Sequence, residues 1–221
     1  MSGGHRGKTW KNGYWIRDIP GFNALNLVGP HEVLSRLDAR CYLVSEKAGK
    51  VLSEKGIAVE ADVGFLDCPS IDTFVVTGGL GQMDMMSHPG LMTFLRNQAS
   101  HSRFVAAVCT GALLLAAAGL LQGRYATTHW LAREERVKYG AIPNPERVVW
   151  DGKFVTGAVY RQGSIWHWTW PGKLQDRRLP SLFSLPSNTI LPLHIESGSS
   201  EKAPSFLVER LKRTSRFYMG T

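Results

Sequence analysis

The sequence predicts an α/β protein with a doubly wound, mainly parallel sheet sandwiched by helices. Two observations support this prediction. Between residues 20 and 158, short runs of β-branched and aromatic residues alternate with stretches of helical character. In addition, residues 104–108 (FVAAV) are apolar throughout, which is typical of a parallel strand covered on both faces.

The expected strands are short runs with high strand propensity. They lie at residues 39–45 (ARCYLVS), 71–77 (IDTFVVT) and 104–108. A further pair of strands is expected within residues 147–157, where Asp151-Gly152 is a dipeptide that favours a tight hairpin turn.

The expected helices follow the turns between these strands. Residues 91–100 form an amphipathic pattern after Pro89-Gly90, and residues 110–121 are rich in alanine and leucine. A last amphipathic helix is expected at 201–219, where Pro204 suits the first turn.

Composition places the chain among ordinary globular proteins. It has 221 residues, 43% hydrophobic and 20% charged, which predicts a single domain over 1–221 and excludes a mainly disordered chain. Its three cysteines have no metal-site or disulfide spacing. With neither a long apolar run nor a signal peptide, we expect a cytoplasmic protein that does not bind membranes.

The formal net charge of +8 first points to a polyanion partner. However, residues 1–19 and 160–194 each hold four basic residues against one acidic residue. Most of the excess charge therefore belongs to two short segments. We expect no nucleic-acid partner.

Cys109 is the candidate nucleophile, because it stands where the apolar strand ends and the Ala/Leu-rich helix begins. This junction is typical of a nucleophile elbow, and the helix N-terminus is expected to favour thiolate. The N–H of Thr110 and the loop Gly78-Gly79-Leu80-Gly81 are expected to stabilise a developing anion. The alternative is that Cys109 is a small buried apolar residue, as we interpret Cys41 and Cys68 to be.

Several motifs resemble the ThiJ/PfpI superfamily, and within it the isonitrile (isocyanide) hydratase branch. The resemblance covers about residues 20–158 and 196–219, although Leu80 replaces a usual proline. The motifs are residues 20–22 (PGF), 29–34 (GPHEVL), 77–79 (TGG), 107–115 (AVCTGALLL), 118–121 (AGLL), 126–130 (ATTHW) and 147–152 (RVVWDG).

This resemblance implies a flavodoxin-like, class I glutamine amidotransferase-like fold, usually as a homodimer. It implies a hydro-lyase that adds water to a small-molecule isocyanide and yields an N-substituted formamide, with no metal or organic cofactor. Cys109 would be the nucleophile, and Thr110 would shape the anion site with Gly78, Gly79 and Leu80. Thr110 follows the cysteine where the protease-like and chaperone-like branches carry histidine.

The chain departs from the branch at Asn26, where an acidic residue is usual. A carboxylate can move a proton, whereas an amide can only hydrogen-bond. This departure favours, as the alternative, an inactive pseudoenzyme or small-molecule-binding protein. Two further alternatives are the ligand-binding domain of a regulator and glyoxalase-like chemistry, against which Thr110 in place of histidine argues. We interpret Glu32, His31, His88 and His129 as structural.

Residues 1–19 and about 159–195 do not resemble the branch. Back-translation of both segments allows a shifted reading frame with a family-like pattern, so we interpret them as out-of-frame translation; the alternative is a divergent insertion. On the frameshift interpretation the chain lacks its first central strand and is expected to fold poorly.

Overall fold

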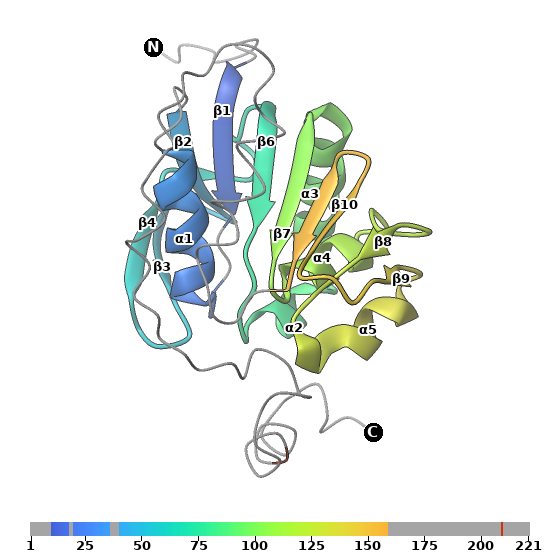
Figure 1. Cartoon of the computed structure of the whole chain (residues 1–221). Helices are drawn as coiled ribbons and strands as arrows, with labels where there is room; N and C mark the ends of the chain where they lie inside the picture. Colours follow the sequence, from blue (N-terminus) through green and yellow to red (C-terminus); the bar gives the residue numbers. More distant parts are fainter. Residues whose placement is uncertain (1–9, 18–19, 36–39, 159–208, 210–221) are drawn as a thin grey trace, which may run out of the picture.

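A computed structural model describes residues 10–17, 20–35, 40–158 and 209. In this part of the chain, the central element is a seven-stranded sheet with the order β10-β11-β7-β6-β1-β2-β5 (Figure 1). Neighbouring strands pair in parallel, except that β10 and β11 form an antiparallel hairpin. The strands are β1 (Trp10–Arg17), β2 (Arg40–Ser45), β5 (Val63–Gly64), β6 (Ile71–Val76), β7 (Phe104–Val108), β10 (Val148–Asp151) and β11 (Phe154–Gly157).

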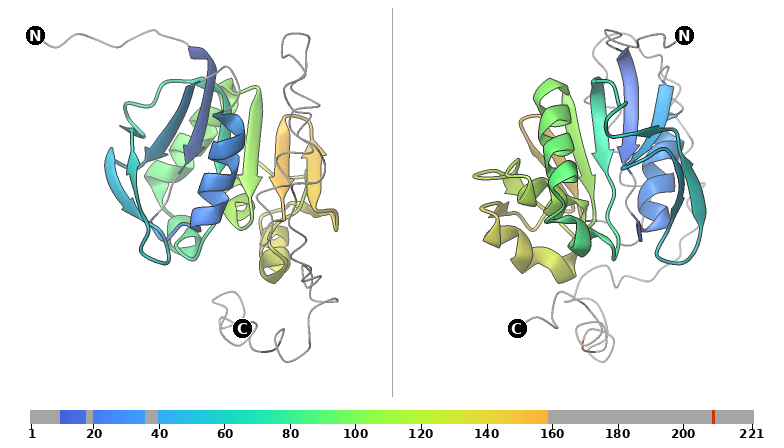
Figure 2. Two further views of the ribbon diagram at one scale, coloured as in Figure 1. Left: turned by 60° about the vertical axis from the view of Figure 1, so that its left-hand side comes forward. Right: turned by 180° about the vertical axis from the view of Figure 1, so that it is seen from behind.

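Helices cover both faces of this sheet. α1 lies in front of the sheet in Figure 1, and α3 lies behind it, as the rear view in Figure 2 shows. The helices are α1 (Ala24–Leu34), α2 (Gln82–Met85), α3 (Pro89–His101), α4 (Gly111–Ala117), α5 (Arg133–Lys138) and the 3-10 turn η1 (Trp130–Ala132). None of the helices described is long and apolar enough to cross a membrane.

Two small sheets complete the described fold. β3 (Gly49–Leu52) and β4 (Ala58–Ala61) form an antiparallel hairpin, and β8 (Tyr125–Ala126) pairs in parallel with β9 (Ile142–Pro143). The main core lies between the central sheet and the helices. Its largest fully buried side chains are Phe22, Leu27, Leu34, Phe74, Leu91, Leu95 and Leu113.

The expected α/β architecture with a mainly parallel sheet is confirmed. The apolar run at 104–108 is β7, and the expected hairpin is formed by β10 and β11. α4 is shorter than the expected helix at 110–121, because Gly119 adopts a positive φ of 78° and ends it. The N–H groups of Gly119 and Leu120 bond to the carbonyls of Ala116 and Leu115, which forms a Schellman motif.

The N-terminal segment corrects one of our expectations. Residues 10–17 form β1, which pairs in parallel with both β2 and β6, so the expectation that residues 1–19 supply no native strand is wrong for this stretch. The physical reason is that Trp10, Tyr14, Trp15 and Ile16 have high strand propensity, and a parallel ladder uses backbone groups that any non-proline residue supplies.

The frameshift interpretation therefore finds no support in the central sheet. The other suspected segment, 159–195, lies outside the described residues. The helix expected at 201–219 does too, apart from Glu209.

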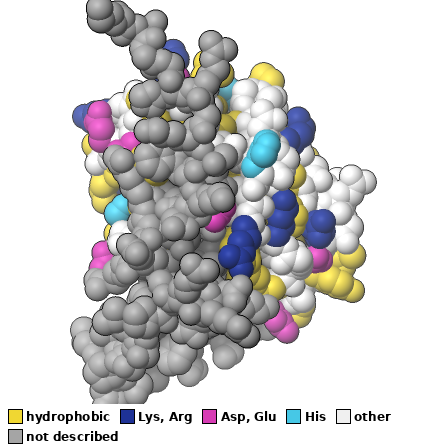
Figure 3. Space-filling view, turned by 90° about the horizontal axis from the view of Figure 1, so that it is seen from above, with side chains coloured by type: hydrophobic (Ala, Val, Ile, Leu, Met, Phe, Trp, Pro, Cys, Tyr) yellow, Lys and Arg dark blue, Asp and Glu magenta, His cyan; other side chains and the backbone are white. Residues whose placement is uncertain are grey.

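Two basic side chains stabilise helix C-termini. Arg96 Nε donates to the carbonyl of Ala118 at 3.0 Å, just beyond α4. Lys153 Nζ donates to the carbonyls of Ala99 and Ser102 at the end of α3. Positive charge is favourable there because the last carbonyls of a helix carry partial negative charge. The contacts of Arg96 and Lys153 are therefore explained by stabilisation of the fold, without a binding partner. On the face seen in Figure 3, basic side chains are interspersed with acidic and uncharged ones.

A proline in β1 tests its place in the sheet. Ile16 stands opposite Leu43 of β2 and Val75 of β6. Ile16→Pro removes a backbone donor in the middle of the sheet and is expected to lower the free energy of unfolding by roughly 2–4 kcal/mol. Ile16→Val keeps the donor and is the control. Equal midpoints for Ile16→Pro and the wild type in denaturant unfolding would contradict this placement of β1.

Candidate active site

Cys109 occupies a strained turn between β7 and α4. Its φ is 57°, and among the described residues it is the sole non-glycine with a positive φ. Its N–H donates to the carbonyl of Gly157 at 2.8 Å, and its carbonyl accepts from Thr128 Oγ1 at 2.8 Å. Such backbone strain costs about 1–3 kcal/mol and persists only where neighbours hold it. The structure thus gives Cys109 the strained strand–helix turn that is typical of a nucleophile elbow.

The glycine loop lies directly against this elbow. A Cβ on Gly78 would lie 2.6 Å from the backbone nitrogen of Thr110, so only glycine fits without a shift. The N–H of Gly79 donates to Thr110 Oγ1 at 3.0 Å. The structure therefore brings Gly78 and Gly79 together with Thr110. The N–H of Gly79 is already engaged by the Thr110 hydroxyl.

Asn26 reaches the same point from α1. Its side chain is buried, hydrogen-bonds to the Cys109 sulfur, and donates through Nδ2 to the carbonyl of Gly78 at 3.4 Å. Cys109, Thr110 and Asn26 therefore meet in space although they come from separate parts of the sequence. An amide at this place can donate to sulfur but cannot accept the thiol proton.

The protonation state of Cys109 differs from our expectation. Burial raises the pKa of the thiol to about 11, although hydrogen bonds from Thr110 and Asn26 lower it. The charge of Glu54 raises this pKa further. The expected preference for thiolate is therefore wrong for this structure: desolvation exceeds the stabilisation by nearby donors, and the thiol is neutral near pH 7. Burial also raises the pKa of Cys41 to about 11 and of Cys68 to about 12.

Glu54, which the sequence analysis did not single out, contacts the glycine loop of this site. It lies in the turn between β3 and β4, and its half-buried carboxylate accepts from Asn23 Nδ2 at 2.8 Å and from the N–H of Leu80 at 3.3 Å. We expected the N–H of Leu80 to stabilise a developing anion, but in this structure it donates to the Glu54 carboxylate. A glutamate in a short turn carries no spacing signal, because such residues are usually solvated.

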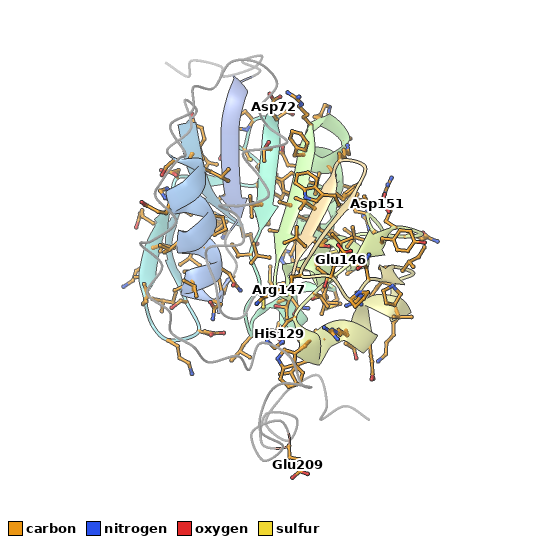
Figure 4. The ribbon with its side chains drawn as sticks, viewed as in Figure 1. Asp72, His129, Glu146, Arg147, Asp151 and Glu209 are labelled. Carbon is orange, nitrogen blue, oxygen red and sulfur yellow. The ribbon has the colours of Figure 1, made fainter. Side chains whose placement is uncertain are left out.

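The segment Thr127-Thr128-His129 supports the elbow from the other side. The N–H of Thr127 donates to Thr156 Oγ1 at 2.8 Å, and His129 Nδ1 accepts from the N–H of Leu131 at 3.3 Å. Burial, with a further effect of Arg133, lowers the pKa of His129 to about 4. His129, labelled in Figure 4, is therefore neutral near pH 7 and takes part in capping η1.

The other polar residues singled out lie outside this cluster. His88 caps α3 by accepting from the N–H of Leu91 at 3.2 Å, and Glu32 is exposed on α1. Within the described ranges, no group of three His, Cys, Asp or Glu residues could hold a metal ion.

Comparison with known proteins identifies the family. A family profile described as the DJ-1/PfpI family matches residues 17–166. The chain belongs to this family. It is 36% identical over 196 residues to an isonitrile hydratase of Pseudomonas putida, covering 88% of this chain and 86% of that protein. It is 26% identical to a deglycase of Thermococcus kodakarensis, over 69% of this chain and 92% of that protein.

Solved structures of DJ-1/PfpI proteins show the same fold. A ThiJ/PfpI family protein from Pseudomonas syringae is 32% identical with a TM-score of 0.66, over 68% of this chain and 64% of that one. DJ-1beta of Drosophila melanogaster is 21% identical with a TM-score of 0.60, over 66% of this chain and 80% of that one, and shows the fold alone.

The extent of the hydratase match also bears on the two suspected segments. Residues outside 1–19 and 159–195 make up about three quarters of the chain, whereas the match covers 88% of it. The match therefore extends into at least one segment that we interpreted as out-of-frame. This gives the frameshift interpretation no support.

A methyl group at Gly111 tests how closely the elbow packs on β6. A Cβ there would overlap the carbonyl of Val76 and lie 2.9 Å from that of Thr77. Gly111→Ala is expected to lower the free energy of unfolding by about 2 kcal/mol, measured by denaturant titration. The control is Gly90→Ala, whose Cβ would meet only the side chain of His88 at 3.3 Å. Equal stability of both variants would contradict this packing.

The lowered pKa of His129 predicts an acid-sensitive fold. An ordinary histidine protonates near pH 6.5 when unfolded, whereas folded His129 stays neutral down to about pH 4. Stability is therefore lost as pH falls from about 6.5 to about 4, by at most about 3 kcal/mol from this residue. His129→Asn keeps an acceptor for the Leu131 N–H, and unfolding titrations should show a shallower pH dependence. An unchanged slope would contradict the buried, neutral state.

Proposed function

We propose that this protein adds water to an isocyanide and releases an N-substituted formamide, with Cys109 as the nucleophile. The observation that carries this proposal is the Cys109 elbow, where Thr110 and Asn26 hydrogen-bond to the sulfur. The 36% identity to an isonitrile hydratase over most of both chains supports the same chemistry.

The proposed reaction balances as an addition followed by a hydrolysis. The Cys109 sulfur bonds to the terminal isocyanide carbon while the S–H bond breaks, and that proton ends on the same carbon. The product is a thioimidate, R–N=CH–S–Cys109. Water then bonds to this carbon, the C–S bond breaks, and the two protons of water end on nitrogen and sulfur. One isocyanide and one water give one formamide.

The residues around the sulfur suit the first step. Negative charge that develops on sulfur is stabilised by the N–H of Thr110 and by the side chains of Asn26 and Thr110. Because the resting thiol is neutral, the proton must leave as the carbon–sulfur bond forms. The rate should therefore depend on a proton acceptor near Cys109.

A second candidate function is binding without turnover. Asn26 favours it, because the amide contacts the sulfur where a proton acceptor would serve the reaction. In that case the elbow would hold a small electrophile or a related ligand without releasing a product.

The decisive assay measures formation of N-cyclohexylformamide from cyclohexyl isocyanide. The wild type is expected to turn over, and Cys109→Ala should lose at least about a thousandfold in rate because the covalent step disappears. Cys68→Ala removes a partly buried cysteine outside the site and is the matched control. Full activity of Cys109→Ala would contradict the nucleophile assignment. Activity in Asn26→Asp but not in the wild type would favour the binding protein.

A further inference from the structure

The reaction proposed above needs a proton carrier that the three predicted site residues do not supply. The thiol of Cys109 is neutral near pH 7, and its proton must move from sulfur to carbon. Asn26 and Thr110 can donate hydrogen bonds, but an amide and an alcohol are poor proton acceptors. A carboxylate close to the thiol would supply the missing step.

Glu54 is held beside the site by backbone contacts of its turn. The N–H of Glu54 donates to the carbonyl of Phe22 at 2.9 Å, and the N–H of Gly21 donates to the carbonyl of Leu52 at 2.9 Å. Phe22 also bridges to Ser53 on one side and to Gly79 on the other. The β3–β4 turn is therefore joined through Phe22 to the glycine loop that contacts Thr110.

Both hydrogen bonds to the Glu54 carboxylate come from segments that reach Cys109. Asn23, which donates to Oε1, also accepts from the backbone N–H of Asn26 at 3.3 Å at the start of α1. Leu80, which donates to Oε2, follows Gly79, whose N–H bonds to Thr110. These two donors fix the carboxylate's orientation. Each oxygen keeps a further lone pair that can accept a proton.

We propose that Glu54 carries the proton between the Cys109 thiol and the isocyanide carbon, the role that Asn26 cannot fill. As sulfur bonds to carbon, the S–H proton moves to the carboxylate, directly or across one water molecule. The carboxyl group then returns this proton to the carbon, which gives the thioimidate and restores the carboxylate. In the hydrolysis Glu54 takes one proton from the attacking water and returns it to sulfur as the C–S bond breaks.

The electrostatics of the site agree with this role. The charge of Glu54 raises the pKa of the Cys109 thiol. His129, which follows the Thr128 that binds the Cys109 carbonyl, is neutral near pH 7. Removing the Glu54 charge should therefore lower the thiol pKa, while removing the proton carrier should slow turnover. Loss of the charge lowers the thiol pKa in either role, so rescue of turnover by a carboxylate at position 26 is the readout that separates a proton carrier from a clamp.

The test compares Glu54→Gln with Glu60→Gln, which alters an exposed glutamate on β4 of the same hairpin. Glutamine keeps the size of the side chain and an acceptor for Asn23 Nδ2 but cannot carry the proton. We expect formamide turnover to fall at least about a hundredfold in Glu54→Gln and to stay within twofold in Glu60→Gln. Thermal unfolding by circular dichroism checks that both variants are folded.

The second readout is alkylation of Cys109 by iodoacetamide, measured by mass spectrometry of the tryptic peptide 104–124 between pH 7 and 10. Glu54→Gln should react faster than the wild type at each pH, because its thiol pKa is lower. The double variant Asn26→Asp/Glu54→Gln restores a carboxylate beside the sulfur. It is expected to recover at least tenfold in turnover over Glu54→Gln alone.

The outcomes separate this inference from the function on which it rests. If the wild type forms no formamide, the proposed function fails, and the proton-carrying role fails with it. If the wild type turns over and Glu54→Gln matches it within twofold, only the role of Glu54 is overturned. Slower turnover without rescue by Asn26→Asp would also overturn it, because that pattern belongs to a structural clamp.

Discussion

The left-handed backbone of Cys109 is the constraint on which the rest of the site depends. A non-glycine residue with a φ of 57° is strained, so the surrounding structure must hold it there. Gly157 accepts from its N–H, Thr128 donates to its carbonyl, and Gly78 lets the neighbouring loop approach Thr110 closely. The order of strands β6, β7 and β11 thus determines where the sulfur lies.

The same burial that fixes the sulfur also determines its chemistry. α4 has only seven residues, and the donors around Cys109 do not offset the loss of water around a thiolate. A neutral thiol is a weak nucleophile, so reactivity depends on moving its proton at the moment of attack. This makes a nearby proton acceptor more important than a preformed thiolate.

The sequence predicted much of the fold because local signals agreed with the tertiary structure. The apolar run 104–108 is β7, and Asp151-Gly152 marks the β10–β11 hairpin. Cys109 was singled out as the candidate nucleophile from its place at a strand–helix junction, and the structure shows that junction. The β1 strand was missed because we judged its segment by its unfamiliar pattern, although Tyr14, Trp15 and Ile16 favour a strand.

Glu54 could not be predicted from the sequence, because nothing local connects a turn glutamate with a cysteine 55 positions later. The connection arises only when Phe22 bridges the β3–β4 turn to the glycine loop. Glu54 comes from the turn of the separate antiparallel β3–β4 hairpin, so its approach to the site depends on how this hairpin packs against the glycine loop. For the same reason, a carboxylate need not stand at position 26 to serve Cys109. An amide at Asn26 is therefore compatible with turnover if the proton passes through Glu54. Whether residue 26 must be acidic thus depends on which group accepts the proton of Cys109.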